Sequence, residues 1–254
     1  MKKITIYSSI FLLFIAFACN QKDKKQSSQK KILFVLTSHD QLGNTDEKTG
    51  YWLSEVSHPW HVFTKAGYTI DFVSPKGGKV PMDPRSNDTN DSINNLFLND
   101  NFYRQKMVNT MQPNEINKGE YEAIFYAGGH GTMWDFPNNT ALSEITSKIY
   151  ENGGVVGAVC HGPAGIVNVK LSNGKYLVNG KKVSAFTNKE ETALKLDTIV
   201  PFSLEDQLVK NGAIMQKADM WHEKVSVDQG LVTGQNPQSA KAVGMEMLKL
   251  LKNK

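Results

Sequence analysis

The residues best able to carry out covalent chemistry stand next to each other in the stretch "GGVVGAVCHGPAGIV" at 153–167. Cys160 and His161 follow an apolar run typical of a buried strand, and small residues come directly after them. A sharp strand-to-helix turn of this kind exposes its central side chain at the top of a sheet, as in a nucleophile elbow. A helix N-terminus at that point also favours the thiolate over the thiol. The stretch therefore predicts a cysteine nucleophile, with a small buried cysteine at a strand end as the alternative.

The chain contains two cysteines, and the first lies in a segment with the layout of a secretory signal. Residues 1–19, "MKKITIYSSIFLLFIAFAC", have a basic start, an apolar core of roughly ten residues and small residues before Cys19. The ending "AFAC", followed by a polar run, resembles the lipobox of bacterial lipoproteins. We therefore expect a lipidated Cys19, a polar tether at 20–30 and an exported, membrane-anchored lipoprotein, with an ordinary cleaved signal as the alternative. Cys160 would then have no partner for an internal disulfide.

Strand and helix patterns alternate along the rest of the chain, and these elements must position the reactive residues. The first predicted helix contains Pro59, where a kink or an early break is expected. The stretch 75–120 is rich in Pro, Asn, Asp and Gly and has the character of an insertion with some helix outside the core. The alternation predicts one doubly wound α/β domain over 31–254, with a mostly parallel sheet flanked by helices. The predicted strands are 31–36, 68–74, 121–129, 154–160, 181–187, 213–218 and 223–234, and the clearest predicted helices are 49–67, 140–152 and 237–251.

Polar residues fall where strands of this sheet end, which is where open parallel sheets place their sites. Besides Cys160, these are Glu55, after the first strand, and the run "GGHG" at 128–131. We therefore expect the three features to meet at one edge of the sheet.

The glycine-rich turn is expected to complete a pocket around the sulfur. An oxyanion formed there needs donors, and the backbone N–H of His161 and one from Gly128 or Gly129 are candidates. His130 lies beside the same turn and is expected to line the pocket, and Trp134 is a candidate for shaping its entrance.

Composition and charge exclude several classes of partner. The chain has 254 residues and a net charge of +4, and its basic residues gather in "KDKKQSSQKK" and not in a stripe with aromatics, so we expect no nucleic acid. His58 and His61 lie three apart, as zinc ligands sometimes do, but no matching cluster follows them. We therefore expect them to pack or to line the pocket, and we expect no metal. Trp221 and His222 are candidates for a further wall of the cleft.

Four separated motifs occur in order: "TGYWLSEVSHPWHVFTKAGYTIDFVSP", "AGGHGTMWDFP", "GGVVGAVCHGPA" and "LVTGQNPQSA". Together they resemble the PfpI-like superfamily, which shares the class I glutamine amidotransferase fold. More narrowly, they are similar to its glyoxalase III and heat-shock chaperone branch, relatives of the parkinsonism-associated protein deglycase. The resemblance covers about 31–254 and implies a flavodoxin-like α/β fold.

The resemblance also implies roles for individual residues. The acid that orients the catalytic histidine falls on Glu191 in "AFTNKEET", and the adjacent Glu190 is the alternative because the glycine that often precedes this acid is missing here. The other implied assignments are the nucleophile at Cys160, the catalytic histidine at His161, the glutamate that hydrogen-bonds the sulfur at Glu55 and the oxyanion donor at Gly129.

For the reaction, the resemblance implies a glutathione-independent, glyoxalase III-type lyase acting on a small reactive carbonyl. The thiolate would attack methylglyoxal or glyoxal, a protonated Glu55 would donate to the sulfur, and His161 would move protons until water releases a 2-hydroxy acid. The scheme needs no cofactor or metal, and a homodimer is expected because relatives commonly dimerise. The alternatives are a cysteine peptidase, amidase or protein deglycase of the same superfamily, and a holdase chaperone or thiol redox sensor without turnover.

Overall fold

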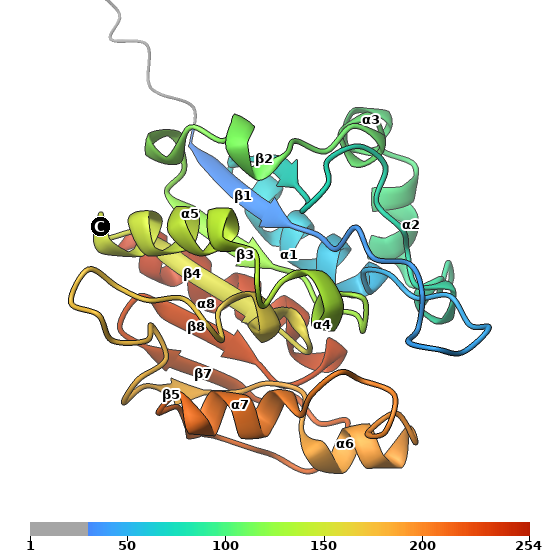
Figure 1. Cartoon of the computed structure of the whole chain (residues 1–254). Helices are drawn as coiled ribbons and strands as arrows, with labels where there is room; N and C mark the ends of the chain where they lie inside the picture. Colours follow the sequence, from blue (N-terminus) through green and yellow to red (C-terminus); the bar gives the residue numbers. More distant parts are fainter. Residues whose placement is uncertain (1–29) are drawn as a thin grey trace, which may run out of the picture.

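A mostly parallel sheet of six strands forms the centre of the computed structural model, which describes residues 30–254 (Figure 1). Its strand order is β2-β1-β3-β4-β8-β7, and β7 alone runs antiparallel to its neighbour. The order extends from β1 in both directions, so the predicted doubly wound α/β fold is confirmed. The strands are β1 Lys31–Val35, β2 Thr69–Val73, β3 Ala123–Tyr126, β4 Val155–Val159, β7 Val225–Asp228 and β8 Leu231–Gly234.

Helices cover both faces of the sheet, as Figure 1 shows. On one face, α1 (Leu53–Lys65) and α8 (Ala240–Lys252) pack against each other and over Ile32 and Phe34. On the other face, α5 (Thr140–Glu151) packs over Leu33 and Val35, because successive strand residues point to opposite sides.

Helix α1 runs through Pro59 without interruption, so the break expected there is absent. This proline lies where α1 meets α8, since a Cβ added to Gly244 would come within 3.1 Å of the Pro59 Cα.

The segment between β2 and β3 belongs to the core, so its prediction as an insertion outside the core was wrong. Its apolar side chains Val80, Phe97 and Met107 are buried against the α1 face of the sheet. The polar residues that suggested a loop act as helix caps: the Asp91 carboxylate, for example, accepts hydrogen bonds from two backbone N–H groups. The short helices here are η1 Pro84–Ser86, α2 Ser92–Leu98, α3 Asn101–Val108, η2 Pro113–Glu115 and η3 Lys118–Glu120.

Two predicted strands, at 181–187 and 213–218, are only two residues long each and pair with each other. The chain leaves this small sheet at Ser184, whose N–H donates to the Thr233 side chain at 2.9 Å. Residues 184–187 then lead the chain past the end of β4. The elements of this region are β5 Lys182–Val183, α6 Asn188–Ala193, α7 Leu204–Lys210 and β6 Ile214–Met215.

Two predicted segments lie almost wholly outside the described residues: the signal at 1–19 with Cys19, and the tether at 20–30, of which only Lys30 is described. Among residues 30–254, no helix is long and apolar enough to cross a membrane.

Candidate active site

Cys160 sits at a strained turn directly after β4. Its φ is +60°, in the left-handed region that costs a side chain with a Cβ energy, and such strain is commonly found at functional sites. Neighbouring strands hold it there, since its N–H donates to the Gly234 carbonyl and its carbonyl accepts from the Phe186 N–H, both at 2.9 Å. Small residues are required after it: a Cβ on Gly162 would lie 2.3 Å from the Tyr126 carbonyl oxygen.

The helix expected after the cysteine is a single 3₁₀ turn, η4, spanning Gly162–Gly165. Its sequence "GPAG" has two glycines and a proline, which do not favour a longer α-helix. The helix-terminus contribution to thiolate stability is therefore smaller than the sequence suggested.

A cysteine, a histidine and a carboxylate lie in line at this turn. The His161 Nδ1 is 3.3 Å from the Cys160 Sγ, and its Nε2 is 2.7 Å from a Glu191 carboxylate oxygen. Glu191 comes from α6, which residues 184–187 bring to the end of β4. All three side chains are buried. Because the Nε2 faces an acceptor, it carries the ring proton, and the Nδ1 lone pair faces the thiol.

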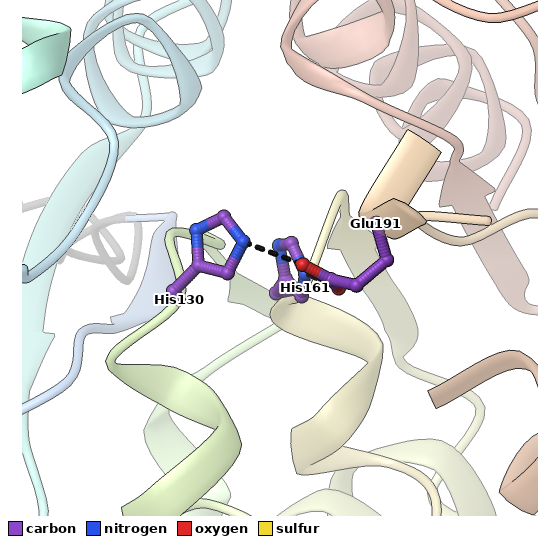
Figure 2. Close-up of side chains that lie close together, drawn as sticks. All are labelled: His130, His161 and Glu191. Carbon is purple, nitrogen blue, oxygen red and sulfur yellow. Dashed lines mark hydrogen bonds and ion pairs between the residues drawn. The ribbon is translucent and has the colours of Figure 1, made fainter. Parts of the chain in front are cut away.

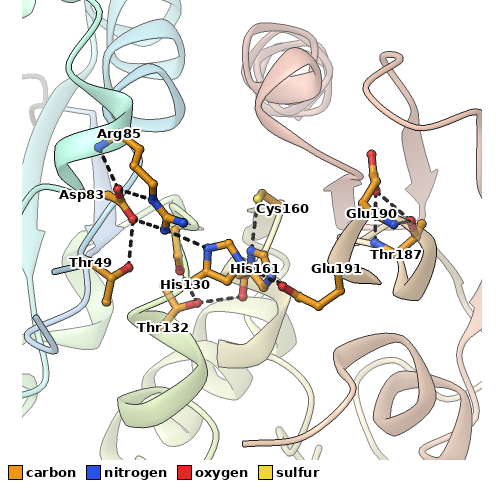
Figure 3. A network of polar contacts seen from close by, with 11 residues as sticks. Thr49, Asp83, Arg85, His130, Thr132, Cys160, His161, Thr187, Glu190 and Glu191 are labelled. Carbon is orange, nitrogen blue, oxygen red and sulfur yellow. Dashed lines mark hydrogen bonds and ion pairs between the residues drawn. The ribbon is translucent and has the colours of Figure 1, made fainter. Parts of the chain in front are cut away.

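A second histidine contacts the same carboxylate from the other side (Figure 2). The His130 Nε2 is 2.9 Å from the second Glu191 oxygen, and its Nδ1 is 3.4 Å from the Arg85 Nη2 (Figure 3). A guanidinium only donates, so the His130 Nδ1 accepts and its Nε2–H donates to Glu191. The sequence placed His130 in the pocket wall but gave no sign that it shares an acid with His161.

The charges of this group follow from burial and from its neighbours. Burial lowers the pKa of His130 to about 4, so this imidazole is neutral at neutral pH. Burial alone would raise the pKa of Glu191, but the two imidazoles outweigh it and hold that pKa well below its usual range. Glu191 is therefore an ionised carboxylate that orients two rings and can stabilise a protonated His161.

His130, His161 and Glu191 together could hold a metal ion, since one ligand atom from each lies within 4.8 Å of the others. The tautomers argue against it. A metal on the His130 Nε2 would move the ring proton to Nδ1, where it would face the donor of Arg85. The arrangement therefore fits a hydrogen-bonded group better than a metal site. The histidine pair considered in the sequence forms no such cluster, because His58 binds the Asp91 carboxylate at 2.9 Å.

Glu55 lies beneath the sulfur and is fully buried. One carboxyl oxygen accepts from the Gly128 N–H at 2.8 Å, and the carboxyl group also interacts with the Cys160 thiol. Burial raises the pKa of Glu55 to about 8, so this residue is protonated at neutral pH and can donate a hydrogen bond to sulfur.

The thiol itself differs from the expectation of an easily ionised cysteine. Burial, followed by the nearby Glu55 carboxyl, raises the pKa of Cys160 well above its ordinary value. The resting side chain is therefore a thiol, and the His161 Nδ1 is the acceptor placed to take its proton when the sulfur attacks. Activation of this sulfur would therefore depend on the adjacent base and not on a depressed pKa.

The structure reduces the number of backbone N–H groups that could donate to an oxyanion. Gly128 is excluded because its N–H is bonded to Glu55. Like the His161 N–H, the Gly129 N–H donates no hydrogen bond to a backbone carbonyl within residues 30–254, so both remain candidates. The Gly129 φ of +101° and the 2.2 Å that would separate a Cβ from the Gly50 carbonyl oxygen make glycine necessary here.

Glu190, the alternative triad acid, points away from the histidines. Its buried carboxylate accepts from the backbone N–H and hydroxyl of Thr187. It also accepts from the Trp221 N–H, in the loop before β7, and from the Gln235 and Asn236 side-chain amides, which follow β8. Figure 3 shows it turned toward Thr187. Of the two adjacent acids, Glu191 therefore contacts His161, and Glu190 ties α6 to the loop that carries Trp221.

The sulfur opens into a cavity of about 410 Å³, here called the cysteine cavity. Trp134 does not border it: its ring stacks on His39, with 4.9 Å between ring centroids, and lines a separate hollow. Trp221 borders it and packs on Phe186, whereas His222 is exposed and does not. The wall includes Trp52, Arg85, His130, Phe186, Leu194 and Trp221.

A doubly wound α/β sheet that presents a cysteine at an elbow, beside a histidine and a carboxylate, is the arrangement of the α/β enzymes that carry a nucleophile elbow. Within that class, the chain belongs to the DJ-1/PfpI family, which it matches over residues 48–250.

Named relatives lie within this family. The glutathione-independent glyoxalase HSP31 of Saccharomyces cerevisiae is 37% identical, with 88% of this chain and 99% of that protein covered. Glyoxalase 3 of Candida albicans is 32% identical, over 83% and 93% of the two chains. Among solved structures, the Rapid Encystment Protein of Francisella tularensis is 44% identical with a TM-score of 0.85, covering 88% of this chain and 99% of that one. Glyoxalase III of Candida albicans is 30% identical with a TM-score of 0.79, covering 88% and 98%.

These comparisons contradict the predicted localisation. The alignment with the yeast glyoxalase HSP31 covers 99% of HSP31 and 88% of this chain. HSP31 therefore has no segment that corresponds to the predicted leader and tether. Two further yeast relatives are matched over 93% of their length. The prediction of an exported, membrane-anchored lipoprotein was therefore wrong. It rested on the apolar run before Cys19 taken by itself, apart from the family to which the domain belongs.

Proposed function

We propose that this protein is a glutathione-independent glyoxalase, which converts 2-oxoaldehydes such as methylglyoxal and glyoxal into 2-hydroxy acids. The observation that carries the proposal is the placing of the Cys160 thiol between two groups of opposite role. The His161 Nδ1, 3.3 Å from the sulfur, can take its proton, and the protonated Glu55 carboxyl can donate to it. The relatives named as glyoxalases support the same reaction.

The first step is addition of the sulfur to the aldehyde carbon. A C–S bond forms, the carbonyl electron pair moves to oxygen, and the thiol proton passes through the His161 Nδ1 to that oxygen, giving a hemithioacetal. The Gly129 and His161 N–H groups are the candidate donors to the oxygen while it carries negative charge. Glu191 stabilises the imidazolium that exists while His161 holds the proton.

Isomerisation and release follow with the same groups. His161 removes the proton from the former aldehyde carbon while the hydroxyl proton of that carbon passes to the neighbouring ketone oxygen, which gives an enediolate. His161 then returns its proton to the former ketone carbon, and the carbon that carries the sulfur becomes the thioester carbonyl. Water then adds to the thioester carbonyl, the C–S bond breaks, and the sulfur leaves as the thiol with a proton returned by His161. The product is a 2-hydroxy carboxylate, and no external oxidant or thiol is consumed.

The direct test is formation of lactate from methylglyoxal without glutathione by the full chain. We expect Cys160→Ser to lose more than about a thousandfold in kcat and Glu55→Gln to lose roughly ten- to a hundredfold. Asp135→Asn is the matched control, because this half-buried carboxyl bonds Thr37 and Ser38 and does not border the cysteine cavity. Wild-type protein that forms no lactate while Asp135→Asn and wild type remain folded would contradict the proposal.

A second candidate activity is the suppression of protein aggregation, which would need no turnover. Exposed apolar side chains on α2 and α3 favour it, since Leu96 is 51% and Phe102 60% exposed. Two variants distinguish the activities. Aggregation suppression should persist in Cys160→Ser and decrease in Phe102→Ser, whereas lactate formation should be lost in Cys160→Ser and persist in Phe102→Ser.

Two expectations about organisation are part of the proposal. Residues 31–254 are expected to unfold as one domain, with a single transition followed by both circular dichroism and tryptophan fluorescence. The expected homodimer is tested by sedimentation at several protein concentrations, and a single monomer mass throughout would contradict it.

A further inference from the structure

Arg85 is a cation fixed in the wall of the cysteine cavity. Its Nε and Nη2 donate to the two carboxylate oxygens of Asp83 at 2.9 and 2.6 Å (Figure 3). Asp83 is fully buried and is itself held by the Thr49 hydroxyl at 2.9 Å. An arginine bound through two parallel hydrogen bonds to a buried carboxylate cannot swing away, so its position is built into the fold.

One end of this guanidinium is left without a protein partner. Within residues 30–254, the Arg85 Nη1 donates no hydrogen bond, while Nη2 also approaches the His130 Nδ1 at 3.4 Å. The other acids that border the cavity do not bind Arg85. Asp91 is occupied by His58 and by two N–H groups of α2, and Asp88 accepts from the Asn90 N–H. A fixed guanidinium edge next to the histidine pair thus remains available to a ligand.

The reaction proposed above changes the charge of what occupies the cavity. A 2-oxoaldehyde is neutral, whereas the 2-hydroxy acid is a carboxylate, which a guanidinium N–H binds through a charge-assisted hydrogen bond. We propose that Arg85 forms a carboxylate subsite beside Cys160, which binds the 2-hydroxy acid product and small aldehydes or alkylating agents that carry a carboxylate. The product part rests on the proposed function; the carboxylate subsite itself does not.

The test compares two alkylating agents of nearly equal size that differ in charge. Iodoacetate and iodoacetamide both react with the Cys160 sulfur, which forms a C–S bond as iodide leaves. The ratio of their rate constants is measured in the full chain from the modified Cys160 peptide by mass spectrometry, so that Cys19 does not contribute. The same ratio for Cys160 in urea-unfolded chain gives the intrinsic preference. We expect folding to shift the ratio toward iodoacetate by about tenfold, as a charge-assisted hydrogen bond predicts.

Variants of the ion pair show whether Arg85 causes this preference. Arg85→Gln should return the ratio to the unfolded value, and Arg85→Lys should keep part of the shift because the charge remains. Removing Arg85 leaves a buried charge at Asp83, so the double variant Asp83→Asn/Arg85→Gln is included to keep a folded protein without the ion pair. An unchanged preference for iodoacetate in the folded double variant, or no preference in wild type, overturns the proposal.

Inhibition by glyoxylate, with neutral glycolaldehyde as the matched aldehyde, provides the second measurement. Glyoxylate should slow alkylation of Cys160 at concentrations about tenfold lower in wild type than in the double variant, while glycolaldehyde should act equally on both. These readouts need no turnover. If the protein prefers iodoacetate but forms no lactate, the subsite proposal stands and the glyoxalase proposal fails. If it forms lactate but shows no preference for iodoacetate, only the subsite proposal fails.

Discussion

Glu190 and Glu191 are adjacent in α6, but their carboxylates serve different parts of the molecule. Glu191 accepts from two imidazoles, whereas Glu190 accepts from Thr187 and from the Trp221 N–H. Their separation follows from helix geometry, since successive side chains in a helix point about 100° apart. One carboxylate therefore contacts the two histidines of the site, and the other contacts the structure that surrounds it.

The first prediction uses this pair as its own control. Glu191→Gln should lower kcat for methylglyoxal by about a hundredfold or more, because a neutral amide cannot stabilise protonated His161. Glu190→Gln should lower the free energy of unfolding by about 1–3 kcal/mol, because its buried hydrogen-bond partners lose a charged acceptor. Steady-state rates and urea unfolding of both variants check this. Equal rate losses in the two would contradict the division of roles.

At the residue scale, the reactive pair Cys160 and His161 could be predicted from the sequence, but the side chains around it could not. Cys160 and His161 could be found because they are adjacent and lie in a distinctive turn sequence. Arg85 could not, since it stands in "MDPRS" among turn residues, and its contact with His130 is between positions 45 residues apart. The raised pKa of Cys160 also depends on burial by distant segments, which local sequence does not report.

At the scale of elements, the junction of β4 and η4 holds Cys160 in a left-handed conformation. Hydrogen bonds to Gly234 in β8 and from Phe186 fix both of its backbone groups. The turn is thus maintained by its neighbours and not by its own preference, as expected of strain retained at a functional site.

The second prediction measures that strain. At ordinary positions glycine is less stable than alanine by about 0.5–1 kcal/mol, but at a positive φ the loss of the Cβ clash offsets this difference. Cys160→Gly should therefore be at least as stable as Cys160→Ala in urea unfolding. Ala158→Gly, in the regular part of β4, is the control and should destabilise the protein. The control shows how much unfolding free energy an alanine-to-glycine change costs at an ordinary position. If Cys160→Gly is less stable than Cys160→Ala by the same amount, Cys160 is not strained.

Element prediction succeeded where patterns were regular and failed where function placed special demands. The apolar strands β1 and β4 and the periodic helix α5 were recognised because burial on a sheet imposes a period. The segment 75–120 was misassigned because its short helices begin with aspartate caps and bury only one or two apolar side chains each. Its membership of the core depends on contacts with α1 and β2, which only the folded chain shows.

At the scale of the whole molecule, buried ionisable groups at the site connect catalysis with stability. The pKa of Glu55 is raised from 4.5 to about 8, so the folded protein keeps a proton that the unfolded chain releases between these values. Stability from this group is present at low pH and is lost as the pH rises toward 8. His130 has the opposite effect on stability, because its pKa is lowered from 6.5 to about 4 and the unfolded chain binds the proton more readily. Its contribution to the free energy of unfolding therefore increases from about pH 4 to pH 6.5 and is constant above that.

The third prediction isolates the Glu55 contribution above the window of His130. Between pH 6.5 and 8, wild type should lose about 2 kcal/mol of unfolding free energy relative to Glu55→Gln, whose amide does not titrate. Urea unfolding of both proteins at four pH values in this range gives the difference directly. A difference that stays constant with pH would mean that Glu55 ionises normally in the folded protein.

The position of the segment between β2 and β3 has a consequence for how this protein can diversify. The sulfur stands on β4, while Arg85 belongs to a stretch that follows β2, three places away in the sheet. Bond making and ligand selection are thus encoded by separate lengths of chain. Exchanging residues 79–98 for another sequence of the same length would redirect which molecules are accepted while the elbow stays as it is. Variation among descendants of this gene is therefore expected to accumulate in that stretch first.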